Sequence, residues 1–188
     1  TWLVLLNKAR ADEYMRRCRL DALIATSPTN VTYFTDYHCW IDYLFKEYMR
    51  TPGAASNMGQ VYALCPLGGD PALVVKASYA VNAANLWVKD INTFGDPGFD
   101  TSLQPGTVPL RLARLYDAVT TPQENSTAME ALLSVIKARG LSRSRIGVEL
   151  EGVPDDVQET IVNALPGAKI LDCTNLIRLV RMVKSSEE

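Results

Sequence analysis

The stretch "VYALCPLGGDPALVV", residues 61–75, decides the fold. Two apolar runs flank a Gly-Gly-Asp turn, and this pattern predicts an antiparallel β-hairpin. On both sides of the hairpin, segments with strand character alternate with segments of helical periodicity, which is typical of a sheet covered by helices. We therefore expect a three-layer α/β fold, in which a mixed β-sheet of about six strands contains one antiparallel hairpin and carries helices on both faces.

The segment upstream of the hairpin begins this alternation. Residues 20–27, "LDALIATS", form a short apolar run that stops at a Ser-Pro pair, and they predict a buried first strand. Apolar residues at helical spacing predict a helix over residues 8–19 before the strand. A short helix, capped by Thr29 or Asn30 and running to Thr35, is expected after it.

The segment downstream of the hairpin continues the alternation. Alanines at helical spacing predict a helix over residues 78–87, and residues 88–94 alternate as a strand. The sequence "TPQE", residues 121–124, is a capping box that predicts the start of a helix ending at Gly140. Residues 110–119 fit strand and helix patterns about equally well.

The last third of the chain repeats the pattern of strand and helix twice. The expected elements are a strand at 145–151, a helix at 154–165, a strand at 168–174 and a helix at 175–184.

The composition excludes several classes of partner and cofactor. The chain has 19 Lys and Arg against 21 Asp and Glu, a net charge of −2, which gives no electrostatic reason to expect nucleic acid or an anionic membrane as a partner. There is no glycine-rich phosphate loop. The four cysteines form no C-x-x-C pair and there is one histidine, so we expect reduced thiols, no zinc site and a cytoplasmic location.

The single histidine lies in an aromatic stretch. Residues 33–48 hold seven of the fifteen Trp, Tyr and Phe residues, so the stretch is either a local core or a recognition surface. His38 and Cys39 are adjacent, but neighbouring side chains in an extended segment point to opposite sides and form no catalytic pair. His38 therefore has no catalytic partner in its own neighbourhood.

Three carboxylates offer an alternative function. Glu149 and Glu151 lie two residues apart on a predicted strand, so their side chains are expected on the same side, and Asp21 lies at the start of the first strand. Together they could hold Mg²⁺, which predicts a self-contained nuclease-like domain. A solvated side chain or a helix cap explains Glu151 as simply, and no basic groove accompanies the three residues.

Four phrases resemble a known family in their order and spacing. They are "LDALIATSPTNVTYFTDY" at 20–37, "YALCPLGGDPALVV" at 62–75, "RIGVELEGVP" at 145–154 and "LIRLVRMVKSSEE" at 176–188. Their order is similar to that in the N-terminal domain of the creatinase/prolidase/aminopeptidase P, or pita-bread metallohydrolase, family. The resemblance implies such a domain with a ribonuclease H-like motif over residues 1–184. Residues 185–188 would then begin a linker to a catalytic domain that the chain does not contain.

The resemblance also implies a function for the domain. It would be non-catalytic, would form a homodimer and would wall the substrate pocket of a parent Xaa-Pro dipeptidase, aminopeptidase P or creatinase-like hydrolase. Its partners would be its own C-terminal catalytic domain, where two divalent metal ions would bind, and a small substrate: an Xaa-Pro peptide, creatine or another amide. The resemblance implies that His38 and Trp40 act in trans, as substrate-gating residues in the active site of the partner subunit. Asp36 stands where the family commonly has glycine.

Overall fold

The computed structural model describes residues 4–38, 60–83, 85–96 and 123–183, together with the single positions 109, 113, 116 and 120. Six strands form one sheet in the order β4-β3-β2-β1-β5-β6. The strands are β1 Ala22–Ala25, β2 Tyr62–Pro66, β3 Ala72–Lys76, β4 Asp90–Phe94, β5 Arg145–Val148 and β6 Lys169–Asp172. Strand β2 is antiparallel to both of its neighbours, and every other pair is parallel. The expected mixed sheet with one hairpin, β2–β3, is confirmed.

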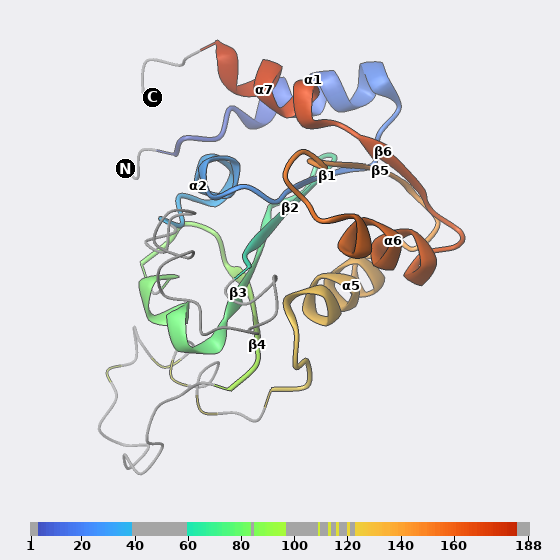
Figure 1. Ribbon diagram of the computed structural model, residues 1–188. Coiled ribbons are helices and arrows are strands. Elements are labelled where there is room, and N and C mark those ends of the chain that lie inside the picture. The colour runs from blue at the N-terminus through green and yellow to red at the C-terminus, as the bar shows by residue number, and fades with distance from the viewer. Residues whose placement is uncertain are drawn as a thin grey trace.

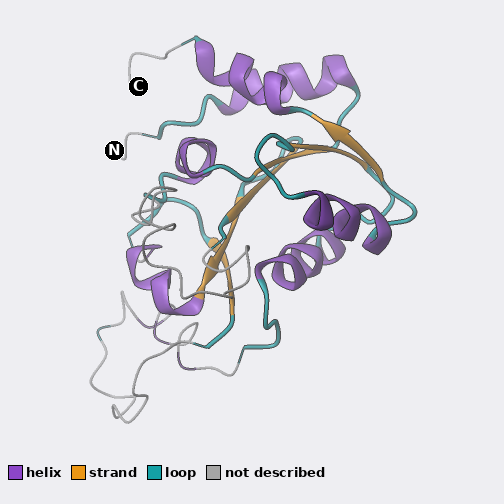
Figure 2. Cartoon of the chain, viewed as in Figure 1, coloured by secondary structure: helices purple, strands orange, loops and turns teal. Residues whose placement is uncertain are grey.

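Helices cover both faces of the sheet, so the expectation of three layers is also confirmed (Figure 1). The helices are α1 Lys8–Cys18, α2 Pro28–Thr35, the 3₁₀ helix η1 Ala77–Ala83, α5 Ala128–Ala138, α6 Asp155–Ala164 and α7 Thr174–Met182. Helices α1, α2, α7 and η1 contribute buried residues to one core, and α5 and α6 to the other. Figure 2 shows the sheet between these two layers.

Strand β1 illustrates why the central strands are continuously apolar. Leu23 and Ala25 belong to the core under α1, α2 and α7, whereas Ala22 and Ile24 belong to the core under α5 and α6. All four side chains are fully buried. A strand that is buried on both faces has no position for a solvated side chain, and the usual polar alternation is therefore missing.

One glycine allows the helix layer to approach the sheet closely. A Cβ on Gly147 in β5 would lie 2.5 Å from Sγ of Cys173 and 2.8 Å from Cδ2 of Leu23. Real Cβ atoms do not come that near to other heavy atoms. The segment between β6 and α7 therefore packs against β5 only because this position carries no side chain.

The predicted start of the helix at residues 121–124 is wrong. Helix α5 begins at Ala128, and its capping box is formed by Thr127 and Glu130. Upstream, the amide of Gly95 donates to the carbonyl of Asn125 at 2.9 Å, and this bond holds the chain beside the end of β4. Two sequences of capping-box type begin six residues apart, at Thr121 and at Thr127. The helix starts at the second, where the chain makes this tertiary contact with the end of β4.

Other element boundaries differ by smaller amounts. The helix expected at 78–87 is the 3₁₀ helix η1, which ends at Ala83. Trp87 lies beyond the end of η1, and its partly buried side chain packs against the core. The amide of Leu86 donates to the carbonyl of Ala83 at 3.2 Å, so the chain turns toward β4 instead of continuing as a helix. Most of 110–119, the predicted linker at 185–188, Cys39 and Trp40 lie outside the described residues. Within the described ranges, each helix is too short or too polar to cross a bilayer.

Candidate functional site

Strands β1 and β5 are parallel neighbours whose connections leave in opposite directions. Ala22 pairs with Ile146, and Ile24 with Val148. The chain passes from β1 into α2 on one face of the sheet and from β5 into α6 on the other (Figure 1). In open α/β sheets, ligands bind outside the carboxyl ends of strands at such a topological switch point. We call the carboxyl ends of β1 and β5, with the N-terminus of α2, the switch-point edge.

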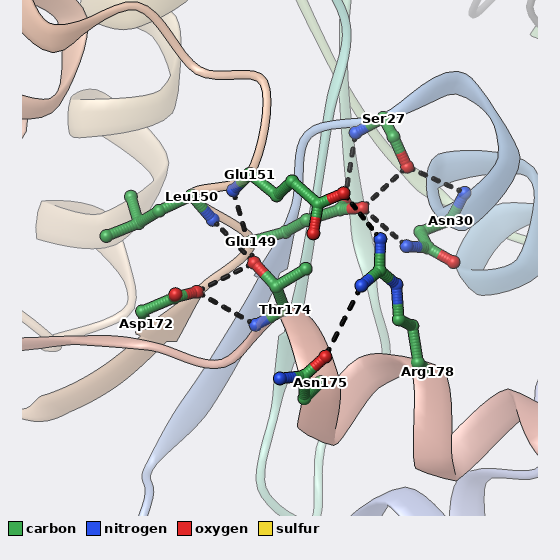
Figure 3. Close-up of polar contacts among 9 residues, drawn as sticks. All are labelled: Ser27, Asn30, Glu149, Leu150, Glu151, Asp172, Thr174, Asn175 and Arg178. Atoms are coloured by element: carbon green, nitrogen blue, oxygen red, sulfur yellow. Dashed lines mark hydrogen bonds and ion pairs between the residues drawn. The ribbon is translucent and has the colours of Figure 1, made fainter.

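A carboxylate of the chain itself occupies the switch-point edge. Glu149 follows β5 directly and is 4% exposed. The backbone amides of Thr26 and Ser27 donate to its Oε2 at 2.8 and 2.9 Å. Its Oε1 accepts from the Ser27 hydroxyl at 2.7 Å and from the side-chain amide of Asn30. Both oxygens are thus satisfied inside the protein, and Figure 3 shows the bonds from Ser27 and Asn30.

The local sequence explains this geometry. Ser27 is the N-cap of α2, and Pro28 takes the first helical position, where its missing N–H costs nothing. The partial positive charge at a helix N-terminus favours an anion there. Phosphates of bound nucleotides use the same position in dinucleotide-binding folds. Here Glu149 supplies the anion, so the arrangement serves to join α2 to β5 rather than to bind phosphate.

A second polar cluster fixes the start of α7. The hydroxyl of Thr174 donates to Oδ1 of Asp172 at 2.7 Å and accepts from the amides of Leu150 and Glu151 at 3.1 and 3.2 Å (Figure 3). The hydrogen bonds from the Thr174 hydroxyl and amide hold the pKa of Asp172 below its usual range. On the surface, Nη2 of Arg178 lies 2.7 Å from Oε1 of Glu151. These bonds join the loop after β5 to α7.

The three carboxylates proposed for Mg²⁺ do not converge. Asp21 precedes β1 and accepts from the amide of Arg145, so it lies at the amino ends of the two strands. Glu149 lies at their carboxyl ends, about 13 Å away for four residues of extended chain. Glu151 turns toward Arg178. Across the described parts of the chain, no three His, Cys, Asp or Glu residues form a group that could hold a metal ion. The nuclease alternative therefore has no structural basis.

The surroundings of His38 differ from the switch-point edge. His38 is exposed and follows the C-terminus of α2. It lines a hollow of about 540 Å³ between α2 and η1, and the other described residues that line it are Asp36, Ser78, Tyr79, Val81 and Asn82. Asp36 adopts a left-handed conformation with φ of 58°, which explains why glycine suits this position. The gating role of His38 and Trp40 stays a prediction.

Sequence reasoning missed the partners of Glu149. Thr29 or Asn30 was the expected cap of α2, and that expectation is wrong, because Ser27 is the N-cap and its side chain accepts from the amide of Asn30. The signal that could have found them is a Ser-Pro pair directly after a buried strand, together with a glutamate directly after a parallel strand. Ser27 and Glu149 then fall at the same edge of the sheet, where the carboxyl ends of parallel strands meet.

The fold and this edge define a doubly wound α/β domain whose usual ligand position is filled by its own carboxylate. The chain belongs to the Creatinase/Prolidase N-terminal domain family, whose model matches residues 8–183. A creatinase from Bacillus sp. (strain B-0618) is 25% identical over 182 residues, which cover 97% of this chain and 34% of that protein.

Two solved structures share the fold at low sequence identity. A dipeptidase from Pyrococcus horikoshii OT3 has a TM-score of 0.57 and 14% identity, and the match covers 96% of this chain and 37% of that one. A proline dipeptidase from Streptococcus pneumoniae has a TM-score of 0.52 and 15% identity, over 95% and 99% of the two chains. At these identities the structural likeness supports the fold alone.

Proposed function

We propose that this chain is the non-catalytic N-terminal domain of a prolidase, Xaa-Pro aminopeptidase or creatinase-like hydrolase. In that protein it contributes to a homodimer and to the wall of the substrate pocket. The observation that carries the proposal is the family match over residues 8–183. The switch-point edge adds support, because Glu149 already fills the position at which such a sheet would bind a ligand.

The chain spans 34% of the length of the creatinase that it matches. We place the reaction in a catalytic domain that would follow this one in a longer protein, with two divalent metal ions bound there. The described residues offer no group that would hold such ions. The reaction is therefore assigned to the proposed second domain, and this domain is given the tasks of assembly and of shaping access to the substrate.

Helix α7 supplies a surface for the proposed homodimer. Leu179, Met182 and Val183 are 43%, 66% and 54% exposed near its C-terminal end. Exposed apolar side chains that gather in one place are typical of a protein contact. Sedimentation equilibrium of the longer protein is the test: Met182→Asp is expected to weaken the dimer. Val162→Asp is the control, because Val162 is also an exposed apolar residue but lies on α6, on the other face of the sheet.

His38 is proposed to reach the partner subunit's active site, with Trp40 beside it in sequence. Its exposure after α2 supports this role, because the imidazole is free to meet another surface. In the longer protein, His38→Ala is expected to lower kcat/KM for an Xaa-Pro dipeptide or for creatine by about tenfold. Lys137→Ala, an exposed truncation on α5, serves as the control. An unchanged kcat/KM for His38→Ala would remove His38 from the site.

The substrate and the compartment are part of the same proposal. The substrate is an Xaa-Pro peptide, creatine or another small amide, and parallel assays of these compounds with the longer protein would distinguish them. We propose a cytoplasmic location. It is supported by Cys18, Cys65 and Cys173, which are free thiols, and reduced cysteines are usual in that compartment.

A further inference from the structure

The hollow between α2 and η1 has the size and lining of a small-molecule site. Its volume of about 540 Å³ lies within the range of ligand pockets. Val81 is an exposed apolar side chain in its wall, and Ser78 and Asn82 add hydrogen-bonding groups. His38 and Asp36 provide the titratable groups. The lining therefore combines an apolar surface with a few polar groups, as ligand pockets usually do.

Among the described residues that line the hollow, Asp36 is the one carboxylate, and none is a lysine or arginine. Asp36 is half-buried. Within the described ranges no basic side chain forms an ion pair with Asp36. Burial raises the pKa of Asp36, while hydrogen bonds from the amide of Leu5 and from the side chain of Trp87 act in the opposite direction. A carboxylate that has lost water without gaining a cation is well placed to bind one.

The contact with Leu5 does not require a charge at this position. The amide of Leu5 donates to Oδ1 of Asp36 at 3.2 Å, which fastens the N-terminal segment to the end of α2. An asparagine would accept the same bond and tolerates the left-handed backbone equally well. The bond to Leu5 therefore needs the oxygen of Asp36 but not its negative charge.

We propose that this hollow binds the cationic nitrogen group, an ammonium or a guanidinium, of a small ligand, with Asp36 as its counter-charge. The proposal rests on the proposed function in one respect: the cationic group is taken to be the charged end of the parent hydrolase's substrate. The binding site itself lies wholly in this chain. It can therefore be tested without the catalytic domain and without a dimer.

The test is an NMR titration of the ¹⁵N-labelled 188-residue chain with methylguanidinium and, separately, with glycinamide at constant ionic strength. We expect saturable shifts of the amides of Asp36, His38, Ser78 and Asn82, with a dissociation constant on the order of 1 mM. Acetamide, which is neutral, and acetate, which is anionic, are expected to leave these amides unmoved. This comparison of ligands needs no variant.

A pair of variants isolates the charge. Asp36→Asn keeps the acceptor for Leu5 and is expected to weaken binding at least about tenfold, which is the effect of removing one counter-charge. Asp70→Asn, an exposed aspartate in the hairpin turn, makes the same change in net charge outside the hollow and is expected to bind like the wild type. Equal shifts with acetamide, or equal affinity in Asp36→Asn, would overturn the proposal. Neither result would bear on the proposed homodimer, which is tested separately by sedimentation of the longer protein.

Discussion

Replacing Glu149 with glutamine is expected to destabilise the domain by about 3–5 kcal/mol. The carboxylate is 4% exposed and accepts from two backbone amides, one hydroxyl and one side-chain amide. Glutamine presents an NH₂ group in place of one oxygen, so either the two backbone amides lose their acceptor or the Ser27 hydroxyl and the Asn30 amide must turn to accept from it. The charge that stabilises the N-terminus of α2 is lost as well.

The magnitude follows from the number of bonds affected. Hydrogen bonds to a charged group each contribute about 1.5–3 kcal/mol, and two of the four are lost or are replaced by bonds to a neutral group. A loss of 3–5 kcal/mol is a large part of a typical stability of about 5–15 kcal/mol. With an m-value of about 2 kcal/mol per molar, the midpoint of urea unfolding should fall by about 1.5–2.5 M.

The assay is equilibrium urea unfolding followed by circular dichroism, with Glu151→Gln as the matched control. Glu151 is two residues away, and its side chain is 61% exposed in its pair with Arg178, which is 49% exposed. An exposed ion pair contributes at most about 1 kcal/mol. If the two variants unfold at the same urea concentration, the buried carboxylate of Glu149 does not stabilise the switch-point edge.

Three further predictions test the packing, the helix cap and the second polar cluster. Gly147→Ala should lower stability by about 1–3 kcal/mol, because its Cβ would meet Sγ of Cys173, and thermal unfolding measures this. Thr127→Ala should cost about 1 kcal/mol through the lost cap of α5, whereas an unchanged melting temperature would contradict the assigned helix start. The lowered pKa of Asp172 contributes stability that is present above its unfolded-state pKa and is lost as the pH falls through its folded-state pKa. Thr174→Val should therefore flatten the acid limb of the stability profile, and an unaltered limb would argue against the hydrogen bonds as its cause.

The sheet was predictable because its signals are local. The hairpin at 61–75 has its turn residues between two apolar runs, and the parallel strands are short apolar segments buried on both faces. The start of α5 was not predictable in the same way. Thr121 and Thr127 each begin a sequence of capping-box type, and the choice between them involves a contact with the end of β4 that is distant in sequence.

The candidate site was predictable only in part, for the same physical reason. Glu149 and Asn30 are 119 residues apart, and no local pattern reveals that they meet. The expectation that Glu149 and Glu151 face one side assumed a strand through residue 151. Strand β5 ends at Val148, so the alternation that the expectation used stops before either glutamate.

The central claim is that this domain does not carry out the reaction to which it contributes. The measurement that tests it most directly is hydrolysis of an Xaa-Pro dipeptide and of creatine by the 188-residue chain, beside the proposed longer protein, with added Mn²⁺. We predict no turnover by the chain above the buffer rate and turnover of one of the substrates by the longer protein. Turnover by the isolated chain that survives purification to constant specific activity would contradict the account.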